Sequence, residues 1–134
     1  MIVADSTLIA YLLIPDHKSV MADEIFLKGP DWAVPLICRS EIRNILNLYM
    51  RHEKKSLNKA KATKEKAEHL WREHEYSVPS NDVLELTHKH HVAAYDGEIV
   101  ALAQELNVTL VTFDKVVKEM YPRVAVDPAD YLKQ

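Results

Sequence analysis

The chain begins Met1-Ile-Val-Ala-Asp5, a short apolar run that ends on an acid. A strand that is covered on both faces of a parallel sheet is apolar throughout, so this run predicts a buried strand whose carboxyl edge lies at Asp5. A helix is predicted directly after it, over 7–13, because Pro15 interrupts the helical pattern. The start of the chain therefore indicates a strand–helix unit with a carboxylate at the end of its strand.

The same alternation of strand and helix continues along the chain. Further short strands are predicted at 32–34, 76–78, 108–112 and 124–126. Helices are predicted at about 20–27, 37–50, 57–73, 96–106 and 115–120, with another that Ser80 caps and a closing helical turn from 127. This alternation predicts an α/β sandwich with a parallel sheet. No linker, repeat or low-complexity tract interrupts residues 1–134, which we expect to form one domain.

Composition excludes several classes of protein and site. The 134 residues are 48% apolar and 28% charged, which suits a packed core rather than a disordered tail. Cys38 is the only cysteine, so disulfide frameworks and multi-cysteine metal sites are excluded. With two glycines, the chain can form neither a G-x-G-x-x-G turn nor a P-loop. The longest apolar run, 9–14, is too short for a membrane helix, and we expect a soluble, cytoplasmic protein.

Charge is distributed unevenly along the chain. The formal net charge is −3, but residues 51–72 hold eight Lys and Arg against three Glu, a net charge of +5 that leaves −8 for the rest. Basic residues of this segment, such as Arg51, Lys59 and Lys61, are candidates to hold the phosphates of a nucleic acid. The alternative is that most of them form a solvated helix face.

Three acids stand at the ends of predicted strands or at the start of a predicted helix. Asp5 and Asp114 directly follow apolar strands, so both are expected at the carboxyl edge of the sheet, where ligands bind in open α/β sheets. Asp96 precedes Gly97 where the helix 96–106 is expected to begin. Each acid could instead be an ordinary helix cap, but two strand-end acids at equivalent places favour a function.

Glu41 is a fourth candidate because the helical pattern turns it inward. It shares a face of the helix 37–50 with Ile37 and Ile45, each four residues away. An inward carboxylate is costly unless it is paired, hydrogen-bonded or bound to a metal ion. An ion pair with Arg39 or Arg43 is the structural alternative to a functional role.

Four converging carboxylates would need cations, because they cannot all stay ionised in a cleft without them. Asn44 follows Glu41 by three residues and could hold that carboxylate by a hydrogen bond. Hard oxygen ligands select Mg²⁺ or Mn²⁺ over zinc. One or two such ions can activate a water and stabilise the leaving oxygen in phosphodiester hydrolysis. The pattern of acids therefore favours metal-dependent hydrolysis of phosphodiesters.

Four blocks of sequence, in this order and spacing, carry a resemblance to a known family. They are Ile2-Val-Ala-Asp-Ser-Thr-Leu-Ile-Ala-Tyr11, Arg39-Ser-Glu-Ile-Arg-Asn-Ile-Leu46, Ala94-Tyr-Asp-Gly-Glu-Ile-Val-Ala-Leu-Ala103 and Leu110-Val-Thr-Phe-Asp114. The chain resembles PIN-domain ribonucleases over nearly its whole length, and among them the VapC-type toxins of bacterial and archaeal toxin–antitoxin pairs.

The resemblance implies a fold and a set of site residues. The expected fold is a PIN-like three-layer sandwich, a parallel five-stranded sheet in the order 3-2-1-4-5 with helices on both faces. Asp96 and Asp5 would be the direct metal ligands within an acidic quartet, and hydroxyl groups would support them. The implied catalytic and metal-binding acids are Asp5, Glu41, Asp96 and Asp114, and the implied supporting hydroxyls are those of Ser6 and Thr112.

This chain departs from the family pattern at two places. Family members often read Asp-Thr-Asn at the first acid, where this chain reads Asp5-Ser6-Thr7, so an amide that could orient ligands is missing. Some relatives carry a further acid after the last one, where this chain has Lys115. Glu98 could substitute for that acid, although a first-turn helix acid that favours the dipole is the simpler interpretation.

The resemblance also implies an activity and partners. The chain would be an endoribonuclease that depends on Mg²⁺ or Mn²⁺, the toxin of a toxin–antitoxin pair, a homodimer, and the target of an antitoxin segment beside its active site. An alternative is a PIN-like domain that has lost catalysis and acts through a protein partner, but the retained quartet favours the nuclease. A phosphatase or phospho-receiver would need Asp-x-Asp at the first strand, which Ser6 and Thr7 do not provide.

Overall fold

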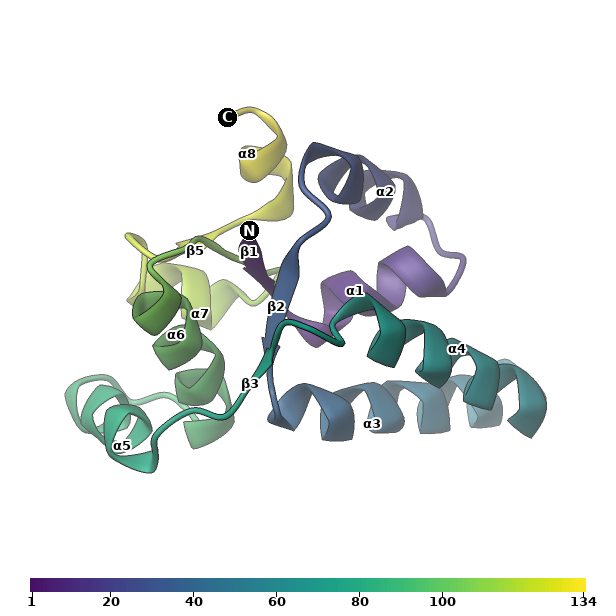
Figure 1. The fold of residues 1–134 in the computed structure, drawn as a ribbon, viewed down its shortest axis with the longest axis horizontal. Coiled ribbons are helices and arrows are strands. Elements are labelled where there is room, and N and C mark those ends of the chain that lie inside the picture. Colours follow the sequence, from purple (N-terminus) through teal and green to yellow (C-terminus); the bar gives the residue numbers. More distant parts are fainter.

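The computed structural model describes residues 1–134, and a five-stranded sheet lies at its centre (Figure 1). The strand order is β3-β2-β1-β4-β5, which confirms the order expected from the resemblance. The strands are β1 (Ile2–Ala4), β2 (Trp32–Pro35), β3 (Glu75–Tyr76), β4 (Leu110–Val111) and β5 (Ala125–Val126). Every neighbouring pair is parallel, with Val3 of β1 opposite Ala33 on one side and Leu110 on the other.

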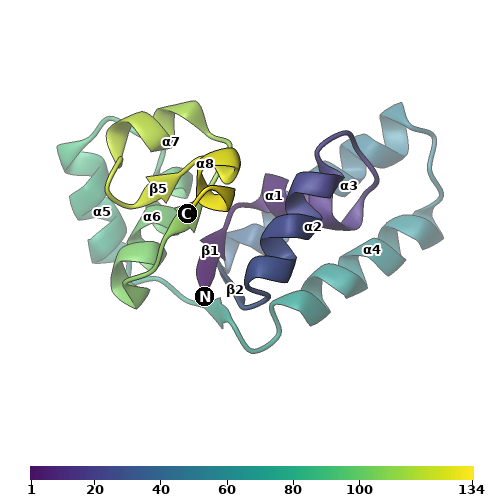
Figure 2. The ribbon, with the colours of Figure 1, turned by 90° about the horizontal axis from the view of Figure 1, so that it is seen from above.

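Eight helices connect and flank the strands. They are α1 (Ser6–Leu13), α2 (Ser19–Lys28), α3 (Ile37–His52), α4 (Leu57–Leu70), α5 (Ser80–Lys89), α6 (Ala94–Leu106), α7 (Lys115–Met120) and α8 (Pro128–Leu132). Figure 2 shows α1 to α4 on one side of the sheet and α5 to α7 on the other. No helix combines the length and the apolar character that crossing a membrane requires.

The two faces of the sheet are covered by separate apolar cores, because alternate side chains of a strand point to opposite faces. Ile2 and Ala4 belong to the core beneath α1 to α4, whereas Val3 belongs to the core beneath α6 and α7. All three side chains are almost fully buried. This explains why the first strand is apolar without alternation, and it confirms the three-layer sandwich.

Helices α5 and α6 pack closely because Gly97 lies between them. A Cβ atom at this position would lie 3.2 Å from Thr87 Cγ2 and 3.3 Å from Val83 Cγ1. These distances are tighter than ordinary van der Waals contact, so the missing side chain of Gly97 lets α5 approach the first turn of α6. The close approach positions the N-terminal end of α6 beside the carboxyl edge of the sheet.

Helices α5 and α6 begin differently from the sequence predictions. Helix α6 begins at Ala94, two residues earlier than expected, with Ala93 in the cap position, so Asp96 lies in the first turn and is not a cap. Helix α5 begins at Ser80, but Pro79 holds the cap position and no side chain makes a cap hydrogen bond. Proline residues and alanine residues are weak cap signals, which is why the polar residues nearby were expected to start these helices.

Candidate functional site

A cleft of about 250 Å³ opens at the carboxyl edge of the sheet, between α1, α3, α6 and the start of α7. It is lined by eleven residues, among them four acids and no Lys, Arg or His. The structure therefore brings together the four acids that the sequence singled out, each from a different segment of the chain. They are Asp5, Glu41, Asp96 and Asp114.

Asp5 is held by hydrogen bonds on both of its carboxylate oxygens. Its Oδ1 accepts a bond from the Leu8 backbone N–H (2.7 Å), so the side chain caps α1. Its Oδ2 accepts bonds from the Thr112 hydroxyl and from the Phe113 backbone N–H, the latter at 3.0 Å. Asp5 thus caps α1 and also lines the cleft, because a carboxylate has about four acceptor sites and can accept bonds in both roles.

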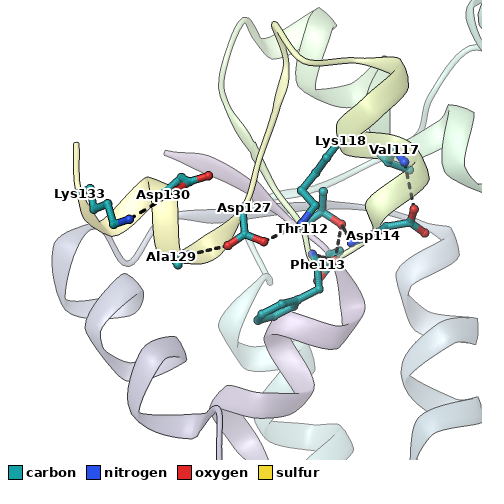
Figure 3. A network of polar contacts seen from close by, with 10 residues as sticks. Thr112, Phe113, Asp114, Val117, Lys118, Asp127, Ala129, Asp130 and Lys133 are labelled. Atoms are coloured by element: carbon teal, nitrogen blue, oxygen red, sulfur yellow. Dashed lines mark hydrogen bonds and ion pairs between the residues drawn. The ribbon is translucent and has the colours of Figure 1, made fainter.

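Thr112 connects Asp5 to Asp114. Thr112 is 2% exposed, and its hydroxyl donates to Asp5. The same hydroxyl accepts a bond of 3.0 Å from the Asp114 backbone N–H (Figure 3). Asp114 Oδ1 in turn accepts a bond of 3.0 Å from the Val117 backbone N–H and caps α7. The ends of β1 and β4 are therefore joined through one buried hydroxyl, which holds two acids at fixed positions. Ser6, the other predicted supporting hydroxyl, is also buried and lines the cleft.

Glu41 projects into the cleft from α3 without a cationic partner. Two arginines flank Glu41 at a distance of two residues, and neither forms an ion pair with it. Arg39 is bound instead to Glu75 and Glu68, with N–O distances of 2.5 and 3.2 Å, and Arg43 makes no ion pair. The structure shows no hydrogen bond from Asn44 to Glu41; Asn44 is exposed and lines a neighbouring cavity. The carboxylate of Glu41 is therefore left facing the other acids.

Crowding and burial raise the pKa values of three of the acids. Burial is the main cause of the raised pKa of Glu41, which reaches about 7, and the charges of Asp5, Asp96 and Glu98 add to it, while the Ser6 side chain lowers it. Burial is also the main cause of the raised pKa values of Asp5 and Asp96, with a smaller contribution from the charge of Asp114. An acidic cleft with these properties attracts cations.

Without divalent metal, we expect the protein to lose stability as the pH rises toward neutrality, partly through Glu41. The unfolded chain releases the Glu41 proton around its ordinary pKa of 4.5, whereas the folded chain keeps it to about pH 7. The folded state binds more protons in this window, so the free energy of unfolding falls as the pH rises through it. Glu41→Gln should reduce this fall, as measured by denaturant unfolding in EDTA across the window. Glu85→Gln, which changes an exposed glutamate outside the cleft, is the control; an unaltered slope in Glu41→Gln would contradict the prediction.

The donor atoms of the cleft fit a hard divalent cation, because its polar lining consists of carboxylate and hydroxyl oxygens. No three His, Cys, Asp or Glu side chains are arranged as a ready-made coordination site. Mg²⁺ retains several waters and is usually bound through one or two carboxylates. The cleft therefore suits a hydrated Mg²⁺ or Mn²⁺ that one or two of the acids hold directly.

The predicted basic residues lie away from the cleft. Arg51 is near the end of α3, ten residues after Glu41, which corresponds to about 15 Å along a helix axis. Lys59 and Lys61 are in the first turns of α4, and Figure 1 shows that α3 and α4 join at the end farther from the sheet. The net charge of a segment could not show this, because it does not reveal which end of a helical hairpin holds the charge. Glu98 does not line the cleft either, although its charge raises the pKa of Glu41.

Sequence reasoning did not single out the aromatic residues of the cleft. Tyr95 and Phe113 both line it, each directly beside one of the acids in sequence. The Tyr95 side chain is 67% exposed. Tyr95 could not be found from hydrophobic periodicity, because that pattern marks core positions and Tyr95 is outside the core, whereas Phe113 packs against the core and the pattern does not mark it as a site residue. The signal that could have identified Tyr95 and Phe113 is their position directly before Asp96 and Asp114 in the sequence blocks quoted above.

Comparison with known proteins agrees with this geometry. The PIN domain family model matches residues 2–121. The chain is 27% identical over 127 residues to "Ribonuclease VapC3" from Pyrobaculum aerophilum, a match that covers 90% of this chain and 95% of that protein. It has the fold of FitAcB from Neisseria gonorrhoeae, with a TM-score of 0.70 and 19% identity over 96% of this chain and 99% of that one. For FitAB bound to an IR36 DNA fragment, the TM-score is 0.66 and the identity is 21%, covering 96% and 95%.

Proposed function

This chain belongs to the PIN domain family, and from that premise we propose that it is an endoribonuclease that depends on Mg²⁺ or Mn²⁺. The observation that carries the proposal is a cleft with four carboxylates and no basic side chain, at the edge of the sheet where ligands bind. The similarity to "Ribonuclease VapC3" supports RNA as the substrate. We assign catalytic and metal-binding roles to Asp5, Glu41, Asp96 and Asp114.

The residues of the cleft have distinct parts in the proposed reaction. Asp5 and Asp96 would hold the ion, and the bonds from Leu8 and Thr112 keep the Asp5 carboxylate in place for it. A bound divalent ion would activate a water and stabilise the leaving oxygen. Glu41 lines the same cleft without a cationic partner, and one of its carboxylate oxygens would accept a proton in the reaction.

A cleavage assay tests the proposal directly. Purified protein is incubated with total cellular RNA in Mg²⁺, in Mn²⁺ and in EDTA, and the products are resolved by length. Discrete fragments in either metal, and intact RNA in EDTA, are expected. Intact RNA in all three conditions, from protein that is folded by circular dichroism, would refute the proposed activity.

Divalent metal should raise the melting temperature of the protein. A ligand that binds only the folded state stabilises it by about 2.7 kcal/mol when its concentration is 100 times its Kd. Relief of repulsion among the acids should lower the Kd, so that the effect is reached at a lower metal concentration than at an uncrowded site. Thermal unfolding is followed at increasing Mg²⁺ and Mn²⁺, with Asp96→Asn as a variant that should respond less. An unchanged melting curve of the wild type across millimolar metal would argue against a metal site in the cleft.

We further propose that the protein is the toxin of a toxin–antitoxin pair and a homodimer. The family relation to a VapC ribonuclease supports the toxin assignment, and it favours a nuclease over a PIN-like domain that only binds a partner. The retained acids support the same choice. Light scattering of the purified chain tests the dimer. Expression of the chain in cells should inhibit their growth. Suppression of that inhibition when the product of an adjacent gene is co-expressed tests for an antitoxin.

A further inference from the structure

A second cavity, of about 480 Å³, adjoins the acidic cleft between α1, α3 and the first turn of α6. Four residues line both spaces, so the two are continuous: Ser6, Thr7, Glu41 and Tyr95. The second cavity differs from the cleft in charge. Glu41 is its only ionisable acid, whereas the cleft has four, and no basic residue lines either space. A group that enters it from the cleft should therefore be neutral rather than anionic.

Tyr95 stands at the boundary between the two spaces. Its ring is 67% exposed, and it is the residue directly before Asp96 in the first turn of α6. Single exposed apolar residues are common and need no explanation. This ring, however, faces a cavity that continues into the proposed active site, and it offers a flat apolar face to whatever lies there.

The rest of the cavity wall combines an apolar surface with neutral hydrogen-bonding groups. Ile37 and Ile45 are half-buried on α3, and Ser40 and Asn44 are exposed on the same helix. The Asn44 amide has both donors and an acceptor, and the Ser40 hydroxyl can donate and accept. A nucleobase has the complementary features, namely two flat faces and an edge of donors and acceptors.

We propose that the cavity lined by Tyr95, Ser40 and Asn44 binds an unpaired nucleobase of a single-stranded polynucleotide, next to the phosphate that is cleaved. The inference rests on the proposed nuclease function and adds a base-binding subsite to it. Base stacking on an exposed aromatic ring is tolerant of sequence and is typical of single-strand binding. A base within a duplex is stacked on both faces and paired along one edge, so it cannot enter the cavity without being displaced from the helix.

The test uses the full-length Asp5→Asn protein, so that the probe is not cut. The probes are single-stranded ribo-oligonucleotides of six nucleotides with one 2-aminopurine, whose fluorescence falls when it stacks on an aromatic ring. Each position of the probe is substituted in turn, and binding is titrated in Mg²⁺. Tyr95→Ala removes the ring and Tyr95→Phe retains it. Leu84→Ala removes another exposed apolar side chain, on α5, that lines neither space.

We expect quenching at one probe position and a loss of that quenching in Tyr95→Ala, with affinity lower by about 5- to 150-fold, the range for one stacked base. Tyr95→Phe and Leu84→Ala should bind and quench as the parent does. The same sequence in a duplex should bind more weakly and independently of Tyr95.

Three outcomes would overturn the inference. Unchanged affinity and quenching in Tyr95→Ala, while the wild-type protein cuts RNA, would refute the base site and leave the nuclease function standing; the cavity would then suit a side chain of a protein partner. Lower affinity in Tyr95→Ala without quenching in the parent at any position would show that the ring does not stack on a base. If the wild type neither cuts nor binds the probes, the nuclease function fails and the base site fails with it.

Discussion

Replacing Asp96 by asparagine should abolish RNA cleavage and leave the fold intact. Loss of a direct metal ligand should cost more than the roughly 10- to 100-fold that loss of an outer-shell partner costs. The structure shows no cap hydrogen bond from the Asp96 side chain, and burial together with the charge of Asp114 raises its pKa. Removing this charge relieves repulsion, so the free energy of unfolding should be unchanged or slightly higher in the absence of metal.

Asp82 provides a matched control for this experiment. Asp82 and Asp96 are both in the first turn of their helices, α5 and α6, but Asp82 lies outside the cleft. Asp82→Asn should therefore cut RNA at the rate of the wild type. Initial rates are compared at equal protein concentration after thermal unfolding has shown that all three proteins are folded. If Asp96→Asn cuts as fast as Asp82→Asn, the assignment of Asp96 is wrong.

Asp5→Asn should also abolish cleavage, but at a cost in stability. The asparagine oxygen can still accept the bond from Leu8 that caps α1. Its amide nitrogen cannot accept the bonds that Thr112 and Phe113 now donate to Oδ2. Each of these two lost hydrogen bonds costs about 1 kcal/mol, and relief of repulsion with Asp114 partly offsets the loss. For this reason Asp96→Asn separates catalysis from folding more cleanly than Asp5→Asn does.

Among substitutions of residues that we do not assign as metal ligands, Thr112→Val should have the largest effect on cleavage and stability. Valine has nearly the shape of threonine, but it removes the hydroxyl that donates to Asp5 and accepts from the Asp114 N–H. Leaving buried partners unsatisfied costs about 1–3 kcal/mol of stability. Cleavage should fall by about 10- to 100-fold, the usual effect of losing a group that orients a metal ligand.

Thr112→Ser is the control because it keeps the hydroxyl and loses only a methyl group. It should retain most of the activity, and its metal affinity should match that of the wild type. Denaturant unfolding gives the stability of both variants, and thermal shifts in Mn²⁺ give their relative metal affinities. Wild-type rates and metal affinity in Thr112→Val would show that the hydroxyl does not position Asp5.

The architecture was largely predictable because it depends on local patterns. The apolar run of β1 is buried on both faces, so its lack of alternation could be recognised without tertiary information. The strand order could not be recognised from local patterns, because it is a long-range property. Strand β1 pairs with β4, which lies more than a hundred residues later in the chain. Only the family resemblance predicted that order, and the structure confirms it.

Helix boundaries were less predictable where the cap is not polar. Ala93 precedes α6 and leaves no signal in the sequence, so the helix was expected to begin at Asp96, which instead lies within its first turn. The shift matters for the site. A cap side chain bonds to its own helix backbone, as Asp5 and Asp114 do, whereas Asp96 in the first turn keeps its carboxylate directed toward the cleft.

The sequence by itself determined which residues could carry the chemistry. Acids placed directly after buried strands, and an acid on the inner face of a helix, are unusual enough to be recognised from spacing and burial cost. Only the tertiary structure decided how these residues are used. Thr112 joins two acids, Glu41 has no cationic partner, Tyr95 borders a second cavity, and Lys59 and Lys61 lie far from the cleft. The physical reason is that hydrogen bonds and electrostatic interactions depend on the distance between residues in space. The separation of two residues in the sequence does not give that distance.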